Sequence, residues 1–573
     1  MYLEMKKNYS KKLKSYPINR KPFWAILFLC FTSFPFLGQG NFTGNIESNF
    51  QYLNSDSVIN AVQPASKGLM NSFMNVFYTN KGFKAGMRME SYLPRIQGYP
   101  NRFDGTGLGM RYVGYGNDFV EVTLGNCYEQ IGSGLALRFY EDRALGYDNT
   151  LDGLRIVIKP RKGVQFKAVY GSQRLTFVSG SVVRGQGLVR GLDGEVHLNE
   201  CFDKLNEFPL DITLGGSFVS KYQADDDDQL ILPENVGLYG GRMKLQYKNV
   251  RLEGEYVQKE QDPSLDNGMI FNYGHAAVVN FGYSKKGIGF SFSAKSVDNM
   301  SFRSDRNKDL QDVFINYLPS LNKTHTYNLV ATLYPYATQP LGEVAYQADF
   351  LYTFKKGSSL GGKYGTTLGL NASTTHRPIA NGSNFNPLDS TGVTYVCKPF
   401  DKSDSLYWRD INVNVTKRVN KKLLLIFSYF NININNDVAK VSNDAIGIIS
   451  SHIGVVEGSY KINAKHNIRA EFQGMFVRKV NGQINDKGNW ATLLLEYTIS
   501  PSYFVSFINQ YNYGNPDPLK KVHYPNITCG YIHESTRIML SYGRQRAGLF
   551  CVGGVCRFVP ANNGLSVSFT QSF

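Results

Sequence analysis

The stretch Leu565-Ser-Val-Ser-Phe-Thr-Gln-Ser-Phe573 decides the fold expected for this chain. Leu565, Val567, Phe569 and Phe573 alternate with polar residues, and Gln571 is the one break. Side chains on a β-strand point alternately to opposite faces, so this pattern predicts a strand with one apolar and one polar face. In a membrane barrel the apolar face meets lipid and the polar face meets the lumen.

The same alternation recurs along the chain, often with Arg, Lys or Glu on the polar face. Clear examples are residues 242–248, 250–256, 344–352, 411–416 and 468–473. A soluble antiparallel sheet would show the same local pattern, with its polar face in water. The alternation therefore predicts strands, and the spacing of turns must separate the two architectures.

Short turns alternate with long loops. The short turns include 80–82, 159–163, 248–249, 284–287, 355–357 and 500–502. The long loops include 95–106, 222–235, 377–404, 437–444 and 547–562. Outer-membrane barrels have this asymmetry, with short periplasmic turns and long outer loops. We therefore predict an all-β, large transmembrane antiparallel β-barrel of about 26 strands, within a range of 24–26, with inward-folded loops. The count depends on how segments 125–152 and 300–325 are interpreted.

Composition agrees with a membrane barrel. The chain has 37 Tyr and 38 Phe, and only 19% of its residues are charged. Beyond the first 40 residues no run of 18 apolar residues occurs, which excludes spanning by helices. No linker divides the chain, so residues 41–573 are expected to form a single barrel with both ends in the periplasm.

Residues 1–40 read as a secretory signal peptide. A basic region that ends at Lys21 precedes an apolar core from Phe23 to Leu37, and Gly38-Gln39-Gly40 supplies small residues for cleavage. Cys30 is preceded by bulky residues, which disfavours lipidation. Loss of seven basic residues and one acidic residue would lower the net charge from +16 to +10. Export makes nucleic acid an improbable partner and leaves lysines at strand ends or in a pore.

Residues 125–149 are too long and too rich in glycine for a plain hairpin. We expect them to fold inward as a lumen constriction, with an ordinary outer loop as the alternative. Arg184 and Arg190, within the Gly-rich residues 184–191, would oppose its acidic residues, although turn chemistry explains those glycines equally well. Rings of charge of this kind set pore selectivity. The candidate residues are Glu129, Arg138, Glu141, Asp142, Arg143, Arg184 and Arg190.

Six cysteines lie beyond the predicted leader. Cys551 and Cys556 flank Gly553-Gly554, a pair suited to a two-residue hairpin turn. They would then face each other across the hairpin, and an oxidising compartment permits a disulfide between them. The sequence offers no pairing for Cys127, Cys201, Cys397 and Cys529.

No motif for catalysis is present: the sequence lacks GxSxG, HExxH and paired metal-binding cysteines. We therefore expect no enzymatic activity, no cofactor and no metal site. The terminal strand with Phe569 and Phe573 predicts an assembly signal, an edge strand read by the barrel-assembly machinery.

Three stretches, 125–149, 325–339 and 548–569, resemble a family of Bacteroidota outer-membrane barrels of largely undefined function. One branch of that family is associated with type IX secretion. The resemblance implies an accessory role in protein secretion or envelope assembly, with other outer-membrane proteins as partners. A porin-like channel for small solutes and a surface receptor or adhesin are the alternatives. No separate plug domain or TonB box is visible, which disfavours TonB-coupled uptake.

Overall fold

The computed structural model describes residues 40–309, 311–382, 395–439, 446–478, 487–552 and 555–573. Asn41–Phe573 form one compact unit. The predicted signal peptide lies outside the described residues, apart from Gly40, and stays a prediction.

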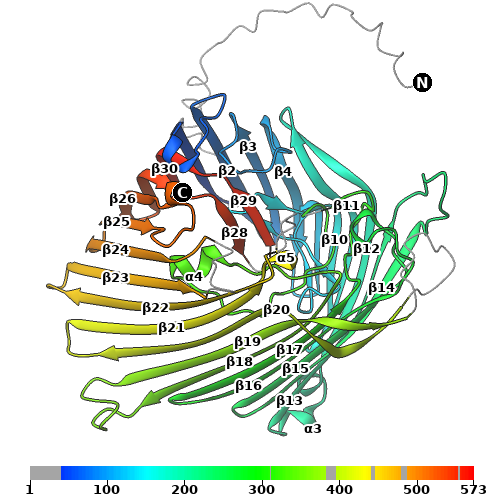
Figure 1. Cartoon of the computed structure of the whole chain (residues 1–573). Helices are drawn as coiled ribbons and strands as arrows, with labels where there is room; N and C mark the ends of the chain where they lie inside the picture. The colour runs from blue at the N-terminus through cyan, green and yellow to red at the C-terminus, as the bar shows by residue number, and fades with distance from the viewer. Residues whose placement is uncertain (1–39, 310, 383–394, 440–445, 479–486, 553–554) are drawn as a thin grey trace, which may run out of the picture. The chain divides into compact units, whose positions relative to one another are not determined.

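The central structure is one sheet of 24 antiparallel strands (Figure 1). Each strand pairs with its neighbours in sequence order, and β30 (Asn562–Ser572) returns to pair with β1 (Asn41–Asn54). The sheet therefore has no free edge. Gly44 lies at the seam, where its amide bonds to the carbonyl of Phe573 at 2.9 Å. A Cβ at Gly44 would lie 2.6 Å from the Phe573 ring, so the close seam requires glycine.

The remaining strands follow in two runs, separated by residues 299–341. The first run is β2 (Gly68–Asn80), β3 (Phe83–Tyr92), β4 (Gly105–Gly116), β5 (Val120–Cys127), β10 (Leu151–Arg161), β11 (Val164–Val178), β12 (Ser181–His197), β13 (Leu210–Tyr222), β14 (Asn235–Tyr247), β15 (Val250–Lys259), β16 (Gly274–Lys285) and β17 (Ile288–Asp298). The second is β18 (Gly342–Phe354), β19 (Thr366–Asn381), β20 (Val396–Arg418), β21 (Leu423–Asn435), β22 (Ile448–Lys461), β23 (His466–Val477), β24 (Trp490–Ile499), β25 (Tyr503–Tyr511), β26 (His523–His533) and β27 (Thr536–Gln545).

Small elements lie in the loops. They are β6 (Gln130–Ile131), β7 (Leu137–Arg138), β8 (Glu141–Asp142), β9 (Tyr147–Asp148), β28 (Gly548–Val552), β29 (Val555–Val559), α2 (Leu198–Cys201), α3 (Asp203–Asn206), α4 (Asn328–Leu333), α5 (Asn436–Ala439) and the 3₁₀ turns η2 (Ser57–Ile59), η3 (Leu265–Asn267) and η4 (Pro518–Lys520). None of the helices in the described ranges is long and apolar enough to span a bilayer.

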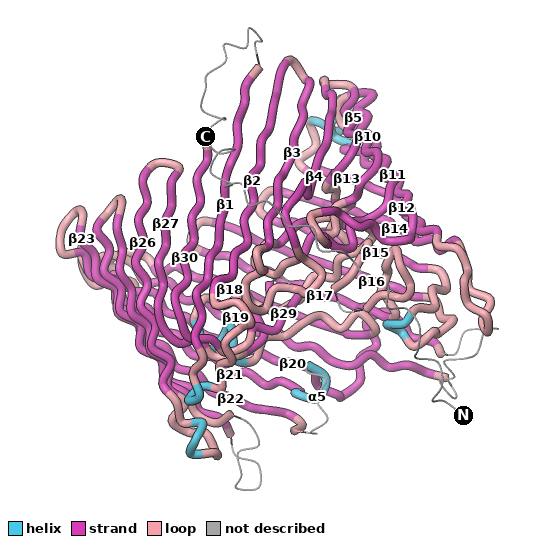
Figure 2. The backbone as a smooth tube through the Cα atoms, turned by 90° about the horizontal axis from the view of Figure 1, so that it is seen from above, coloured by secondary structure: helices cyan, strands magenta, loops and turns pink. Residues whose placement is uncertain are grey.

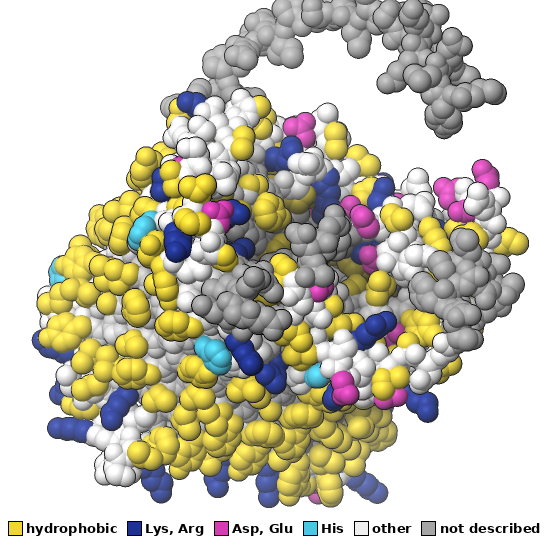
Figure 3. Space-filling view, in the orientation of Figure 1, with side chains coloured by type: hydrophobic (Ala, Val, Ile, Leu, Met, Phe, Trp, Pro, Cys, Tyr) yellow, Lys and Arg dark blue, Asp and Glu magenta, His cyan; other side chains and the backbone are white. Residues whose placement is uncertain are grey.

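The outer face of the sheet is apolar. Phe427, Val456, Phe472 and Leu493 are register partners on four successive strands, and each is more than 40% exposed. Figure 3 shows hydrophobic side chains gathered over the outside of the strands, with Lys and Arg at their edge. A closed sheet with such a belt matches a bilayer, because every backbone polar group is paired and the exterior is hydrocarbon-like. The protein is an outer-membrane β-barrel.

The predicted fold class is confirmed, and the sheet has 24 strands, the lower end of the predicted range. The two segments on which the count depends supply no wall strands. Residues 128–150 fold into small hairpins, and residues 299–341 carry a helix. Their short apolar runs resemble barrel strands in sequence because they, too, pack against a buried surface. The loop predicted at 377–404 is also shorter, since β19 and β20 extend into it at both ends.

Short turns and long loops alternate along most of the chain, with exceptions at residues 179–180, 198–209 and 355–365. Lys81-Gly82 and Lys248-Asn249 each join two strands at one end, while residues 223–234, 260–273 and 299–341 connect strands at the other. Several long loops turn back among the strands, as the view from above shows (Figure 2). The predicted inward-folded loops are therefore present, and they bring the candidate site into the lumen.

Candidate functional site

Two long inner segments occupy the lumen: the first inner segment, residues 128–150, and the second inner segment, residues 299–341. Each begins and ends on residues that are partners in the wall. Cys127 pairs with Leu151, and Asp298 pairs with Gly342. Each segment is therefore an insertion at the tip of a hairpin, and the register of the wall does not depend on it.

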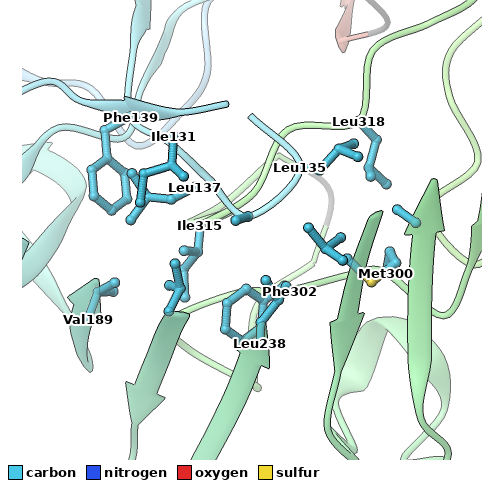
Figure 4. Close-up of a cluster of buried hydrophobic side chains, with 14 of the residues drawn as sticks. Ile131, Leu135, Leu137, Phe139, Val189, Leu238, Met300, Phe302, Ile315 and Leu318 are labelled. Atoms are coloured by element: carbon cyan, nitrogen blue, oxygen red, sulfur yellow. The ribbon is translucent and has the colours of Figure 1, made fainter. Parts of the chain in front are cut away.

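The first inner segment has an apolar side that packs on the wall. Ile131, Leu135, Leu137 and Phe139 are at most 2% exposed and belong to a cluster with wall residues such as Val189 (Figure 4). Barrel walls often present polar groups to the lumen, so apolar side chains facing inward here mark a surface that needs a partner. Their burial holds the segment inside the barrel.

Charged residues of the wall fasten the opposite side of this segment. The guanidinium of Arg88 donates two hydrogen bonds of 2.8 Å to Glu141. Arg174 donates to Glu90 at 2.7 and 2.8 Å and to Asp148 at 2.9 Å. The side chains of Arg88, Glu90 and Arg174 are at most 4% exposed. Bidentate Arg–carboxylate bonds fix orientation as well as contact, so they set the position of the segment.

Arg143 extends this charged lattice toward β1. It donates to Glu141 at 3.0 Å and to Glu47 at 2.8 Å, and its guanidinium lies 4.6 Å from the centre of the Phe73 ring. Burial raises the pKa of Glu141, although Arg88 and Arg143 act in the opposite direction. Glu141 is thus a carboxylate held in a site of low polarity by two arginines.

Glu129 forms a second tether. Its carboxylate accepts from Arg155 at 2.6 Å and from Lys167 at 2.8 Å. Burial alone would raise the pKa of Glu129, but the bonds from Lys167 and Arg155 bring it below its ordinary value. The carboxylate is therefore charged near neutral pH, and it ties the start of the first inner segment to β10 and β11.

Arg138 and Asp142 have more local roles. The Arg138 guanidinium lies between the rings of Tyr140 and Tyr317, at 4.4 and 4.1 Å from their centres. Asp142 accepts a hydrogen bond from the amide of Leu145 and so closes a turn within the segment. The structure thus brings Glu129, Arg138, Glu141, Asp142 and Arg143 into the lumen, as predicted from the sequence; their role as a constriction stays a prediction.

The prediction for Arg184 and Arg190 is wrong. Both lie within strand β12, where alternate residues face opposite sides. Val189 is buried in the inner cluster and Leu192 is 60% exposed, so Arg190, two residues before Leu192, faces outward. Arg184 bonds to Asp152 and Arg190 to Asn235. Neither arginine opposes Glu129, Glu141 or Asp142.

The glycines beside these arginines serve close packing of an inner segment against the wall. A Cβ at Gly187 would lie 1.7 Å from the carbonyl oxygen of Ser304, so the second inner segment approaches β12 closely only because residue 187 is glycine. A strand with three glycines resembles a loop in sequence, which is why the alternation did not reveal β12 here.

The second inner segment extends between two apolar regions of the wall. Met300, Phe302 and Ile315 are fully buried beside the first inner segment. Farther along, Leu329 and Leu333 of α4 pack in a separate cluster with side chains from the wall strands β20 to β24. The wall residues of this cluster include Trp408, Phe430, Ile432, Ile453, Met475 and Trp490. Figure 1 shows α4 within the ring of strands, next to β28.

Polar contacts supplement this packing at α4. The amide of Leu329 donates to Gln473 at 3.0 Å, and the hydroxyl of Tyr327 donates to Glu457 at 3.2 Å. His325 lies 2.5 Å from Asp410. Orphan amides at a helix start need such acceptors, because no preceding turn supplies them. The wall thus holds both inner segments, by different chemistry.

The wall residues that hold the inner segments were not among the residues predicted from the sequence. Arg88 and Glu90 stand between Met87, Met89 and Ser91 in β3, a pattern that marks them as inward-facing. That signal was available, but it gives no partner, because Arg88 and Glu141 lie 53 residues apart. Arg174 lies beside a register shift in β11, where simple alternation fails.

The structure pairs Cys551 with Cys556 in the register of β28 and β29, as the hairpin prediction requires. Gly553, Gly554 and the side chains of both cysteines lie outside the described residues, so the disulfide stays a prediction. Cys127, Cys201, Cys397 and Cys529 are free thiols. Within the described ranges, no group of three or more His, Cys, Asp or Glu side chains is placed to hold a metal ion.

The sequence of this chain matches the model of one protein family. Residues 19–573 match the profile described as "Family of unknown function (DUF6029)". None of the curated proteins compared with the chain matches it.

Solved structures similar in fold include three bacterial proteins. The siderophore receptor PiuA from Acinetobacter baumannii is 10% identical, with a TM-score of 0.35, 92% of this chain and 81% of that chain being covered. The copper transporter OprC is 8% identical, with a TM-score of 0.39, and the match covers 94% of this chain and 80% of that chain. The outer membrane protein opdK from Pseudomonas aeruginosa is 13% identical, with a TM-score of 0.30, and the match covers 72% of this chain and 98% of that chain. Likenesses this distant assign no function to the chain.

Proposed function

Since the chain belongs to the family of unknown function DUF6029, we propose its function from the barrel itself: an outer-membrane channel for small solutes, held closed by its two inner segments. The observation that carries this proposal is the pair of anchored insertions in the lumen. A barrel of 24 strands encloses a wide interior. Here both insertions lie across that interior and are fixed to its wall.

The construction of the insertions supports movement rather than permanent filling. Because each insertion starts and ends on partner residues of the wall, it can shift without breaking a strand pairing. The first inner segment is positioned by a few directional charge pairs, which water can replace when the segment moves. Opening would therefore displace an inner segment while the barrel stays intact.

Solute entry into vesicles tests this proposal. Wild-type protein in liposomes should admit small neutral solutes slowly, and the double variant Arg88→Ala/Arg174→Ala should admit them faster, because it frees the first inner segment. Arg251→Ala is the matched control, since Arg251 is 61% exposed and its ion pair in the described part of the chain is with Glu253 on the same strand. Equal rates for the wild type and the double variant would contradict the proposal.

The accessory role in secretion or envelope assembly is supported by the resemblance to Bacteroidota barrels alone. We propose separately, from the even strand number and the terminal strand, that both ends of the barrel lie in the periplasm and that the assembly machinery reads Phe569 and Phe573. A deletion strain tests the accessory role: surface protein export should fall if the barrel serves secretion. Unchanged export together with altered solute uptake would favour the channel.

A further inference from the structure

A small cavity lies where the two inner segments meet the loop 260–273. Its volume is about 220 Å³. The residues that line it are Tyr140, Tyr147, Asp266, Arg303, Gln311, Phe314, Asn316, Tyr317, Leu318, Ala337, Thr338 and Pro340. It lies inside the barrel beside the closing segments, and the tethers described above do not occupy it.

Asn316 points to a ligand. It is 4% exposed, and its side-chain nitrogen donates to the carbonyl of Met300 at 3.0 Å. Its Oδ1 is buried and has no hydrogen-bond partner among the residues that the structure describes. Leaving a buried acceptor without a partner is unfavourable, so its presence at a cavity calls for a donor from a bound molecule. Ile315 and Leu318, on either side of it in sequence, are held in the apolar cluster (Figure 4).

The charges at the cavity are already matched. Arg303 donates to Asp266 at 3.2 Å and to the carbonyls of Asp309 and Asp312 at 3.2 and 2.7 Å. The carboxylate of Asp266 has further lone pairs, which can accept from a ligand. The cavity thus offers acceptors around a neutralised ion pair, which favours a neutral molecule that carries hydroxyl donors.

Aromatic rings form another part of the lining. The rings of Tyr140 and Tyr317 lie 5.8 Å apart at 80° to each other. Burial raises the pKa of Tyr140, so its hydroxyl stays neutral and can donate. The parts of these rings that Arg138 leaves uncovered offer apolar contact to the C–H side of a cyclic molecule, while the amide and carboxylate accept from its hydroxyls.

Size narrows the class further. Pockets for drug-sized ligands measure roughly 300–1,000 Å³, so a cavity of about 220 Å³ holds one ring. We propose that this cavity binds a single neutral, polyhydroxylated ring of monosaccharide size. The ring would pack against the tyrosine side chains and donate hydrogen bonds from its hydroxyls to Asn316 and Asp266. This goes beyond closure of the channel, because binding can be measured whether or not the barrel conducts.

Saturation-transfer NMR on the full-length barrel in a sugar-free detergent tests the site, with D-glucose, D-galactose and N-acetyl-D-glucosamine as probes. At least one probe should give a saturable signal from its ring protons. Asn316→Leu should weaken its affinity about tenfold, as loss of one buried hydrogen bond implies. Asp266→Asn, which keeps the size of the side chain, should also weaken it.

Asn328→Leu is the matched control. Asn328 lies in the same inner segment and also has a buried Oδ1 without a partner, but it does not line this cavity. The Asn328→Leu variant should bind the sugar with the same affinity as the wild-type protein. The inference is overturned if none of the three sugars gives a saturable signal, or if the two asparagine variants weaken binding equally. Faster solute entry in the tether variants would bear only on the channel.

Discussion

The two inner segments close one lumen but are held in different ways. The first inner segment packs one side into an apolar cluster and is oriented by buried ion pairs from Arg88 and Arg174 of the wall to Glu141 and Asp148. The far end of the second inner segment, around α4, is held mainly by a cluster of aromatic and aliphatic side chains. Ion pairs are directional and few, whereas apolar contacts are many and individually weak. A single substitution should therefore release the first segment more readily than the second.

Excision of the second inner segment should have the largest effect. Replacing residues 299–341 with an Asn-Gly turn would join Asp298 to Gly342, which already face each other in the wall. Solute entry into vesicles should rise steeply, because the segment that extends between both apolar regions is gone. Excision of residues 128–150 should raise entry less. The reverse order would show that the first inner segment is the main barrier.

Arg174→Ala should release the first inner segment. Asp148 of the segment would lose the 2.9 Å hydrogen bond from Arg174, and the wall residue Glu90, which is 1% exposed, would lose its bidentate partner. Breaking such a buried pair costs roughly 3–5 kcal/mol. Hydrogen exchange of residues 128–150 should accelerate while that of α4 stays unchanged. Uniform acceleration over both segments would show that they move as one body.

Leu329→Ala should loosen the α4 end. Leu329 is fully buried, and a cavity of this kind costs roughly 2–5 kcal/mol. Exchange should accelerate in α4, with less effect than Arg174→Ala because the neighbouring apolar contacts remain. Leu519→Ala, at a position that is 86% exposed, is the control and should change little. If Leu329→Ala accelerated hydrogen exchange more than Arg174→Ala does, the second inner segment would be the more easily released of the two.

Glu129→Gln should have the smallest effect, and it should depend on pH. The lowered pKa of Glu129 means that its tether stabilises the folded state above the ordinary carboxyl value of 4.5 and is lost as pH falls through the lowered value. The melting temperature of the variant should lie a few degrees below that of the wild type from pH 8 to pH 5. The difference should shrink below pH 4.5. A constant difference down to pH 3 would contradict this assignment.

The sequence predicted the wall well because strand alternation is local. Residues 243–256 and 565–573 face as expected, and the turns between strands fall close to the predicted positions. The sequence also placed Glu129, Glu141 and Arg143 in an inward loop, because glycine and charge in that stretch do not suit a lipid-facing strand.

The tethers could not be predicted in the same way. The bond from Arg88 to Glu141 depends on how far the loop folds back, which alternation does not encode. Residues 300–325 left the strand count open, because alternation does not separate a short apolar run in an inner segment from one in the wall. Arg184 and Arg190 were placed in the lumen because their glycines suggested a loop, although the strand continues through them.

Single-channel recording on wild-type protein in planar bilayers tests the central claim, closure of the lumen, most directly. Anchored inner segments predict a silent barrel, with at most brief openings, and a steady current once residues 299–341 are excised. A large, steady current through the wild-type protein would contradict closure by these segments.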